Sequence, residues 1–469
     1  MNRTTKSWVT AGFAVAFGLT SALVQAQPAP PVQPTSLGPL DEYIREGLAN
    51  NLALKQESLE ISRVTESLNQ ARAMFYPRLA FTPTYSVAAG GRRLDFPVGD
   101  LLNPVYTALN KLTGSDRFPT NIENVNQLLA PNNFHDTKFS FSYAIYNTDI
   151  QYNYLIQKEL LSAQQARRRV VENELRYTII TAYYQYLQSL DALQIYENSR
   201  RVLGELVRLN QKLVNNSVAT KDVVSTAEYE VSKLKQQVAV AEKNRETARA
   251  YLNFLLNREL GTAVLVDSSL IKNELSIASE NLVGLEETAI NHRQEIQQLG
   301  GSLRAAQIAV KLNEANAMKP NVFVGGNAGF QGFGYSFTNQ QYVVAQVGLQ
   351  WDLFKGYEKR SKIQQAKIQT NALTTRLAEI QQQIRLQVLQ AYYDLDAAQE
   401  SVTATAQGVS ATSQTLRVID SKYRNGQSLL IELIKAQNDN ITAQIQQSLA
   451  RFDVLMKQAA LNRVVSVSP

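Results

Sequence analysis

The sequence predicts a membrane protein of the α+β class, built from short amphipathic β-strands and very long coiled-coil α-helices. Three observations support this prediction. The chain opens with an export signal, two stretches of more than 60 residues contain no proline, and alternating segments of about 10 residues precede each long stretch. The same order of segments occurs twice, which indicates an internal two-fold sequence repeat.

The first 26 residues predict a secretory signal peptide. Arg3 and Lys6 precede an apolar run, and Val24 and Ala26 supply small residues at the usual cleavage spacing. We therefore expect residues 1–26 to be removed and residues 27–39 to form a Pro-rich lead-in. An uncleaved anchor is the alternative, although the apolar run is short for a bilayer-spanning helix.

The composition argues against several classes of site. The chain has no cysteine, so disulfides, thiolate metal sites and a lipid-modified N-terminal cysteine are excluded. The formal net charge of +6 becomes +4 once Arg3 and Lys6 leave, too small an excess over 469 residues to indicate nucleic acid. His135, expected in a long loop, and His292, on a helix, lack the partner spacing of a metal or nucleophile site. We expect no catalytic residue, metal or cofactor.

The repeat is visible in several aligned phrases. LRYTIITAYY, from Leu175, matches IRLQVLQAYY, from Ile384, at an offset of 209 residues. Upstream, LNQARAMFYP resembles LNEANAMKP, and downstream, LVNNSVATKDVVSTAE resembles YRNGQSLLIELIKAQ. Each half therefore runs helix, proline stop, alternating segments, very long helix, turn and helix. We assign residues 40–260 to the first repeat, 261–283 to an equatorial linker, 284–464 to the second repeat and 465–469 to a C-terminal tail.

The longest helices are predicted at residues 149–214 and 357–424. At a rise of about 1.5 Å per residue, each would extend roughly 100 Å. Apolar residues recur in both at spacings of four and three, the pattern of a narrow coiled-coil seam. The seam residues are Val171, Leu175, Ile179, Ala182, Tyr186, Leu190 and Leu193 in the first helix, and Ile380, Ile384, Val388, Ala391 and Leu395 in the second.

One helix cannot bury such a seam alone. We expect its first neighbour to be the helix that follows it, at residues 219–257 or 428–463. The tyrosines of the two AYY phrases lie on or beside the seam, so packing is their expected role.

Two pairs of alternating segments predict four strands per chain. We place them at residues 79–89 and 137–146 in the first half and at 321–330 and 342–354 in the second. Each is about as long as a tilted strand that crosses a bilayer with one face toward lipid. Tyr146, Trp351 and Phe354 lie at strand ends, where membrane-interface aromatics gather. The glycines of residues 325–334 are expected between strands, where hairpin geometry explains them.

Four strands cannot close a membrane barrel. The smallest membrane barrels use about eight strands, and an open edge in lipid leaves backbone groups unpaired. Several chains are therefore expected to share one barrel. A soluble sheet with two amphipathic hairpins is the alternative, but the narrow-seamed helices could not cover it.

The ordered set of features resembles the TolC-type outer membrane factor family, the outer membrane efflux proteins. The signal, the duplicated plan, the helix-Tyr-Pro-strand transition, the AYY helices and the Tyr-x-x-Gly turn cover nearly all of the mature chain. The resemblance implies a homotrimer whose twelve strands, four per chain, form one outer-membrane β-barrel. An α-helical coiled-coil barrel would continue it as a tunnel across the periplasm of a Gram-negative cell envelope.

The resemblance also implies a function. The protein would be the exit duct of a tripartite efflux or type I secretion system. It would dock through a periplasmic adaptor, or membrane fusion protein, on an inner-membrane pump of the RND or ABC type, with outer-membrane lipid around the barrel and no nucleic acid. The loop of residues 90–136, much longer than the linker of the second strand pair, would face outward, and its PVYTALNKLTG segment is expected to form a short helix.

The turns at the far ends of the long helices are the candidate partner site. Asn215 and Asn216, like Asn425 and Gly426 in the second copy, tolerate the left-handed backbone that stops a helix. The resemblance implies that these tips form the periplasmic entrance and receive the adaptor. The candidate docking residues are Asn216, Ser217, Val218 and Ala219 in one groove, and Gly426, Gln427, Ser428 and Leu429 in the other.

Residues beside the tips are the candidate periplasmic gate. By the same resemblance, Tyr423 matches a constricting tyrosine, and Asp222 and Glu432 match acidic positions at the entrance. Lys435 departs from the family pattern, which has an acidic residue there, and Ser428 stands where an arginine would be expected. An Asp/Arg/Tyr latch in its familiar form is therefore not expected. A solvated helix face is the alternative for each charged residue.

Two other functions stay open on the sequence alone. A structural coiled-coil tether or adhesin of the cell envelope would use the helices without conduction, although such proteins tend to keep their strands at one end of the chain. A soluble exported helical scaffold would keep its strands out of the membrane. The sequence names neither the substrate nor the pump and adaptor.

Overall fold

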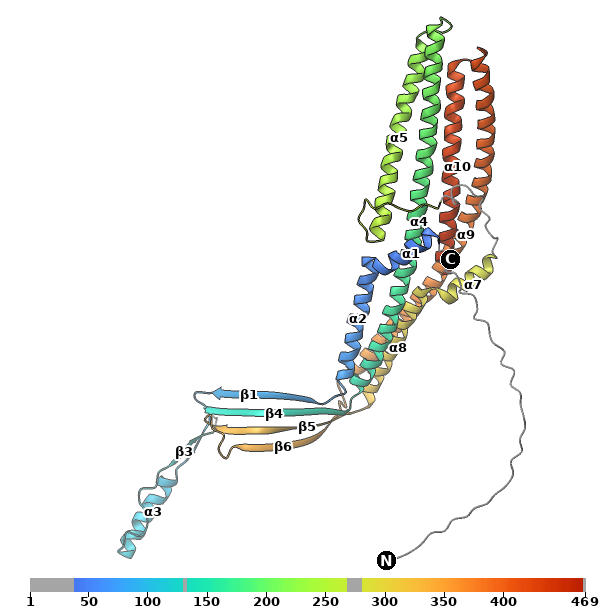
Figure 1. The fold of residues 1–469 in the computed structure, drawn as a ribbon. Coiled ribbons are helices and arrows are strands. Elements are labelled where there is room, and N and C mark those ends of the chain that lie inside the picture. The colour runs from blue at the N-terminus through green and yellow to red at the C-terminus, as the bar shows by residue number, and fades with distance from the viewer. Residues whose placement is uncertain (1–37, 130–132, 268–280, 467–469) are drawn as a thin grey trace, which may run out of the picture.

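The structure is a computed structural model that describes residues 38–129, 133–267 and 281–466. The predicted signal peptide, all but the last two residues of the predicted lead-in, residues 268–280 of the predicted linker and residues 467–469 of the predicted tail lie outside the described residues. Figure 1 shows an elongated molecule with two long helical hairpins at one end, a sheet below them and an arm that projects from the far end of the sheet.

The order of elements is the same in the two halves, apart from the arm. The first half contains α1 (Pro39–Asn50), α2 (Leu52–Ala73), α4 (Thr148–Asn215) and α5 (Asp222–Leu255), and the second contains α7 (Leu282–His292), α8 (Gln294–Met318), α9 (Glu358–Arg424) and α10 (Leu430–Val465). Two strands stand between the second and third helix of each set. The two very long helices are confirmed within one residue of their predicted bounds.

Local signals in the sequence start the helices of the first half. Asn147 precedes α4, and its side chain accepts a hydrogen bond from the Ile150 N–H at 3.1 Å, which satisfies a free donor of the first turn. Asn51 caps α2 in the same way through Ala53 N–H at 2.9 Å. Its amide also donates to Leu255 O at 2.8 Å and so joins the start of α2 to the end of α5.

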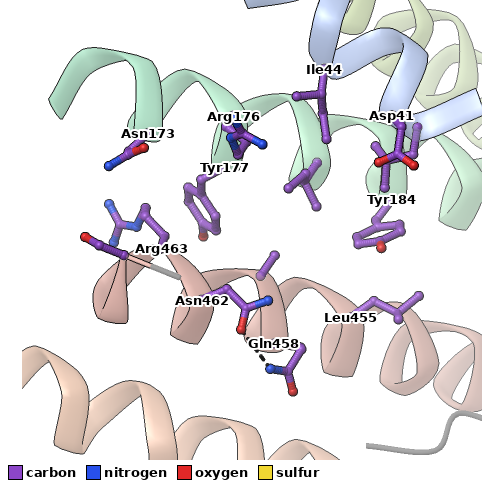
Figure 2. Close-up of a pocket in the computed structure, with 14 residues that line it drawn as sticks. Asp41, Ile44, Asn173, Arg176, Tyr177, Tyr184, Leu455, Gln458, Asn462 and Arg463 are labelled. Atoms are coloured by element: carbon purple, nitrogen blue, oxygen red, sulfur yellow. Dashed lines mark hydrogen bonds between the residues drawn. The ribbon is translucent and has the colours of Figure 1, made fainter. Parts of the chain in front are cut away.

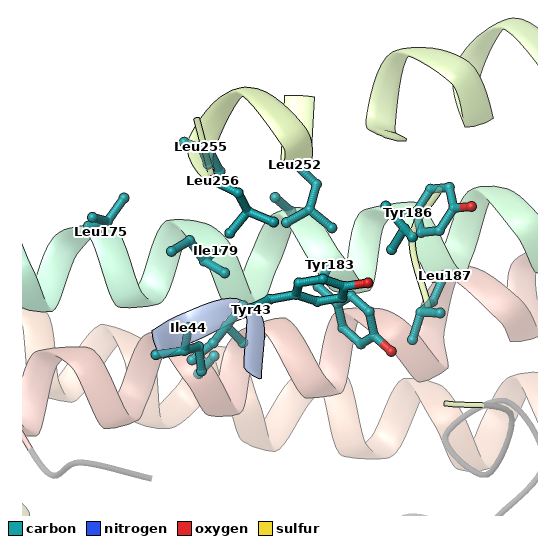
Figure 3. Close-up of a cluster of buried hydrophobic side chains, with 14 of the residues drawn as sticks. Tyr43, Ile44, Leu175, Ile179, Tyr183, Tyr186, Leu187, Leu252, Leu255 and Leu256 are labelled. Atoms are coloured by element: carbon teal, nitrogen blue, oxygen red, sulfur yellow. The ribbon is translucent and has the colours of Figure 1, made fainter. Parts of the chain in front are cut away.

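Helix α4 is the central helix of the molecule. It packs against α1, α2, α5, α8 and α10, so both halves of the chain meet on it. Figure 3 shows the main cluster of buried side chains along α4, which brings together Tyr43 and Ile44 of α1, Leu175, Ile179, Tyr183, Tyr186 and Leu187 of α4, and Leu252, Leu255 and Leu256 at the end of α5. Tyr183 is fully buried, and its hydroxyl accepts the Asp267 N–H at 3.0 Å.

The predicted seams are confirmed, with one difference in width. Ile179 and Ala182 are buried in α4, and Ile384 and Val388 are buried in α9. The buried stripe of α4 is wider than predicted because several helices pack on it at one level, and it also includes Ile180, Tyr183 and Leu187.

The AYY tyrosines do not behave alike in the two copies. Tyr183 and Tyr184 pack in the first cluster and Tyr392 in the second. Tyr393 is 58% exposed, so packing within the chain does not explain this residue.

The strands form one antiparallel sheet in the order β1-β4-β5-β6. These are β1 (Arg78–Val87), β4 (Asn133–Tyr146), β5 (Asn321–Phe333) and β6 (Gln341–Gln350). The two halves of the chain therefore meet at the β4–β5 pair, and β1 and β6 are the outer strands. The four predicted strands are confirmed, and the structure shows that the two predicted pairs join in one sheet.

The predicted alternation is present in the register. Leu79 pairs with Phe141, and Phe81 pairs with Phe139 with ring centroids 4.9 Å apart. The same face continues through Ala328 to Val343. Its large side chains are exposed, and Figure 1 shows no helix over the sheet. The opposite face carries polar residues such as Ser140 and Asn327.

Several predicted strand bounds were wrong. β6 ends at Gln350 rather than 354, so Trp351 and Phe354 lie in the connection to α9. Asp352 forms an ion pair with Lys355 at 2.6 Å in this connection. β4 starts at Asn133, which places His135 on a strand rather than in a loop.

The glycines of β5 also correct the prediction. Gly326 and Gly329 lie inside the strand, not between strands, and a Cβ on either would overlap a carbonyl oxygen of the neighbouring strand. Their role is a close approach of backbones.

His135 is fully buried and holds the β5–β6 turn to β4. Its Nε2 lies 2.7 Å from Ser336 O and 2.6 Å from Gln340 Oε1, so Nε2 carries a proton and donates to both acceptors. The rings of Tyr335 and Phe337 pack beside it.

The arm occupies most of the predicted long loop. It contains β2 (Arg93–Phe96), α3 (Val98–Thr113) and β3 (Val125–Leu128), with β2 and β3 paired as a separate ribbon. The helix in this loop is confirmed, whereas the two ribbon strands were not predicted.

Within the described ranges, no helix combines the length and the apolar content needed to cross a membrane.

Substitutions at two adjacent glycines of α8 can test how closely α8 packs against α4. A Cβ on Gly301 would lie 3.0 Å from the Ala163 Cβ and 3.1 Å from its backbone nitrogen, so Gly301→Val would force α8 away from α4. We expect a loss of about 1–3 kcal/mol, the usual cost of overpacking, seen as a lower unfolding midpoint by circular dichroism.

The matched control is Gly300→Val. A Cβ on Gly300 meets only the Arg304 guanidinium at 3.5 Å, so this variant is expected to unfold within about 0.5 kcal/mol of the wild type. Equal losses for the two variants would contradict the close approach at Gly301.

Candidate functional site

The tips of the two long hairpins lie at the same end of the molecule. Figure 1 shows the turn between α4 and α5 near the turn between α9 and α10, at the end away from the sheet. The structure therefore brings the predicted tip residues of the two halves to one end, although more than 200 residues separate them in sequence.

Both tips have the same backbone geometry. Ser217 has φ 59°, and Gly426 has φ 71°. The Val218 N–H donates to Leu213 O at 2.9 Å, and the Gln427 N–H donates to Lys422 O at 2.8 Å. At each tip a second hydrogen bond spans fewer residues: the Ser217 N–H donates to Val214 O, and the Gly426 N–H donates to Tyr423 O. This is the Schellman motif, which ends a helix with one left-handed residue.

The motif corrects the expectation for the first tip. Asn215 lies inside α4, and Asn216 is the C-cap with φ −88°, so neither is left-handed. The left-handed residue is Ser217, which matches Gly426 at the offset of 209 found for the AYY phrases, whereas the predicted match of Asn216 with Gly426 is one residue out of register.

The candidate docking residues are mostly exposed. Val218 is 71% exposed and Leu429 is 67% exposed, so each tip presents an apolar side chain to its surroundings. Ala219 and Ser428 are half-buried, and the other four residues are exposed.

Tyr423 connects the two hairpins. Its hydroxyl donates to Asn210 Oδ1 at 2.6 Å, and the Asn210 amide donates in turn to Val223 O at 3.3 Å. Asn210 is fully buried. One side chain of α4 thereby links α9 to α5. Burial raises the pKa of the Tyr423 hydroxyl above its usual range, so the hydroxyl stays protonated and can donate.

The sequence analysis missed Asn210. A signal was present, because Leu203, Leu206 and Asn210 follow one another at spacings of three and four along the apolar seam of α4. An amide at a seam position needs a partner, since a buried polar group without one costs about 1–3 kcal/mol. The sequence could not supply the partner, which lies 213 residues away.

Glu432 caps the start of α10. Its carboxylate accepts hydrogen bonds from the Ser428 hydroxyl and from the Leu429 N–H, the latter at 3.2 Å. These donors, the Ser428 hydroxyl first, lower the pKa of Glu432, so the side chain carries a negative charge at neutral pH.

The other gate candidates have separate surroundings. Asp222 is the first residue of α5 and accepts a hydrogen bond from the Thr220 hydroxyl. Lys435 is exposed one turn after Glu432. Each charged candidate thus lies at its own helix start or on an outer face. Among the four gate candidates, all of which the structure describes, Tyr423 is the one that bridges the hairpins.

The candidate interface aromatics gather at one end of the sheet. Tyr146 ends β4 opposite Val322, and Trp351 follows Gln350, which pairs with Asn321. Trp351 is 49% exposed, and Phe354 is 82% exposed. All three lie at the end of the sheet that adjoins the helices.

A cavity of about 190 Å³ lies where α1, α4 and α10 meet. Figure 2 shows Tyr177 and Tyr184 on one wall and Gln458, Asn462 and Arg463 on the other, with a hydrogen bond of 3.0 Å from Gln458 to Asn462. The Arg463 guanidinium lies 4.6 Å from the centre of the Tyr177 ring and pairs with Glu174 at 2.6 Å. These groups fasten α10 to α4 and offer no nucleophile beside a base.

No group of three or more His, Cys, Asp or Glu in the described part of the chain is arranged to hold a metal ion.

Comparisons with known proteins agree with this architecture. The model of the outer membrane efflux protein family matches residues 285–466, which include most of α7 and all of α8, α9 and α10. A curated relative, the outer membrane efflux protein BepC of Brucella suis biovar 1 (strain 1330), is 28% identical over 115 residues. That match covers 24% of this chain and 25% of the length of BepC.

Solved structures match nearly the whole chain. The outer-membrane channel OprN is similar with a TM-score of 0.72 and 15% identity, over 92% of this chain and 90% of OprN. CusC is similar with a TM-score of 0.73 and 14% identity, over 94% of this chain and 95% of CusC. At these identities the likeness establishes the fold. The second half of the chain, at residues 285–466, therefore matches the outer membrane efflux protein family, and the whole described chain has the fold of the outer-membrane channels OprN and CusC.

Proposed function

We propose that the protein is a passive exit duct of the outer membrane, a homotrimer that conducts substrates from an inner-membrane pump and a periplasmic adaptor to the exterior. The observation that carries this proposal is the four-stranded sheet, which has an exposed apolar face and two outer strands, β1 and β6, each paired on one side only.

The sheet requires other copies of the chain if it lies in lipid. Unpaired N–H and C=O groups on β1 and β6 would each cost several kcal/mol there, and the smallest membrane barrels use about eight strands. Pairing β1 of one copy with β6 of the next removes both edges. Three copies give a twelve-stranded barrel whose apolar face, with Leu79, Phe81 and Val343, would lie toward lipid.

The helices would continue the same passage. At about 1.5 Å per residue, the 68 residues of α4 extend roughly 100 Å from the sheet end to the tip. Two similar hairpins per chain would give a tunnel wall of six similar units. Such a wall is more uniform than one of three, which accounts for the repeat.

The tips are the proposed entrance and adaptor site. Val218 and Leu429 are the exposed apolar residues that an adaptor would cover, and the left-handed residues Ser217 and Gly426 fix the two turns that present them. The pump would be of the RND or ABC type, and the substrate would be chosen by that pump.

The hydrogen bond between Tyr423 and Asn210 is the proposed closing contact of the entrance. It joins the two hairpins of one chain through a buried amide, and no charge is required. Opening would separate α9 from α4 at this point and would expose both polar groups together.

The central test of the proposal is conduction by an assembly of defined mass. The purified mature chain is expected to form particles of three copies in mild detergent, by light scattering, and to give discrete conductance steps in planar bilayers. Trimers without conductance would favour a structural tether or adhesin. A protein found only in the aqueous fraction of the cell envelope would favour the soluble scaffold.

Glu432→Gln is expected to reduce the cation selectivity of the channel. Three Glu432 carboxylates around a common axis would create a local negative field at the entrance, which the neutral amide removes. Reversal potentials in a salt gradient measure this change. Asp439→Asn, at an exposed position two turns further along α10, is the control. An unchanged reversal potential for Glu432→Gln would remove this residue from the gate.

Loss of the Tyr423–Asn210 contact is expected to loosen the entrance. Tyr423→Phe and Asn210→Ala would each raise the mean conductance, and the double variant would add little to either. In a double-mutant cycle on the unfolding free energy, the coupling is expected to be about 1–3 kcal/mol, because each single variant leaves one buried polar group unpaired.

Tyr196→Phe is the control for this cycle, since Tyr196 packs against the same cluster of buried residues. Effects of Tyr423→Phe and Asn210→Ala that simply add, or a conductance equal to that of Tyr196→Phe, would rule out the contact as a latch.

A further inference from the structure

We infer that the arm between β1 and β4, residues 92–129, is a self-association surface. One face of α3, which we call the outer stripe, carries Leu101, Val105, Ala108 and Leu112. The inference is that the outer stripe packs against the same stripe of a second copy, beyond the end of the sheet that lies away from the helices. It rests on the proposed trimer, which would bring three arms together at that end.

The arm is a folded unit rather than an irregular loop. Asn103 exchanges two hydrogen bonds with the backbone of Ile122, both at 2.9 Å, and Asn110 does the same with Phe118 at 2.8 and 3.1 Å. Tyr106, which lies between them on the helix, stacks on Phe118 with ring centroids 5.6 Å apart. The inner face of α3 is therefore fixed to the returning segment by residues spaced three or four apart.

The outer stripe lies on the opposite face of the helix and has no such partner in the described chain. Leu101 is 60% exposed, Val105 is 51% exposed and Leu112 is 82% exposed. Ala108 lies between them and is also exposed. The residues follow one another at spacings of four, three and four, the coiled-coil spacing that the buried seam of α4 also shows. A narrow stripe of this spacing fits another helix.

The charged residues of the arm favour a second arm, rather than an anionic lipid surface, as the partner of the outer stripe. A helix that lies on such a surface has an excess of lysine and arginine on its polar face. The arm has four basic and four acidic residues and no net charge; they are Arg92, Arg93, Lys111 and Arg117, and Asp95, Asp100, Asp116 and Glu123.

The position of the arm explains why a contact of few residues would be enough to hold two arms together. The arm leaves the sheet from β1, one of the two strands that would pair with a neighbouring copy, and Figure 1 shows it projecting past the sheet end. Linked copies bind each other at an effective concentration in the millimolar range, so three or four residues per helix can hold the arms together.

The test uses the absence of cysteine from the natural chain. Ala108→Cys places one thiol on the outer stripe of the full mature protein. Thr107→Cys places one on the neighbouring exposed residue, which points well away from the stripe. Each purified variant is treated with a mild oxidant and analysed on a denaturing gel, and its particle mass is measured before oxidation.

We expect both variants to be trimers and the Ala108→Cys chain to form a disulfide-linked pair. At most about two-thirds of the chains can enter that pair, because three thiols form one disulfide and leave one thiol free. Thr107→Cys is expected to cross-link about tenfold more slowly, since its Cα atoms would lie beyond the separation of roughly 7 Å that a disulfide spans.

Other results would overturn the inference in distinguishable ways. Trimers in which Ala108→Cys fails to cross-link, or cross-links no faster than Thr107→Cys, refute the arm contact and leave the duct intact. Monomers refute the duct and the arm contact together. A polarity-sensitive dye attached to the thiol of the Ala108→Cys variant that responds only when lipid vesicles are added would assign the stripe to a membrane surface instead.

Discussion

The sheet of this protein has two open edges, and much of the architecture follows from that constraint. β1 and β6 each pair on one side only, and the apolar face between them carries exposed side chains such as Phe81 and Val343. Water suits the edges but not the face, and lipid suits the face but not the edges. Joining identical sheets edge to edge resolves both demands at once. In the proposed trimer, the helices that leave one end of each sheet would surround a common axis, so closure of the sheet would also position the tunnel.

Helix α4 connects the sheet to the tips. It begins where β4 ends, carries the buried cluster around Tyr183, and reaches the first tip at its other end. Because α1, α2, α5, α8 and α10 all pack on it, the two halves of the chain cannot shift independently near its middle. Toward the tips fewer helices surround α4, and Asn210 becomes the polar link between the hairpins. The middle of α4 is thus packed on several sides, whereas near the tips the Tyr423–Asn210 hydrogen bond is the contact that we propose to hold the hairpins together.

The two halves share a plan but differ in the arm and in some residues outside the shared seam. Only the first half carries the arm, with α3 and its ribbon. Tyr184 is half-buried in the first half, whereas Tyr393, which matches it at the offset of 209, is 58% exposed. A wall made of similar units needs similar helix lengths and seams, which both copies keep. Residues outside the shared seam are free to differ, and in the proposed assembly these residues would face neighbouring copies and partners.

Features that depend on local periodicity could be predicted from the order of the amino acids. The absence of proline indicated the two very long helices, the spacing of four and three located their seams, and the alternation of side chains defined the two faces of a four-stranded sheet. The folded chain was needed to show where β6 ends and that His135 lies in a strand beside Ser336 and Gln340. It was also needed to show that Ser217 is the left-handed residue of the first tip and that Asn210 accepts a hydrogen bond from the Tyr423 hydroxyl. His135 and Asn210 depend on contacts between residues about 200 positions apart, and the end of β6 depends on its pairing with β5. A pattern within a window of 10 or 20 residues carries no information about such contacts. Ser217 is the exception, since its place follows from the repeat once the offset of 209 is kept through the turn.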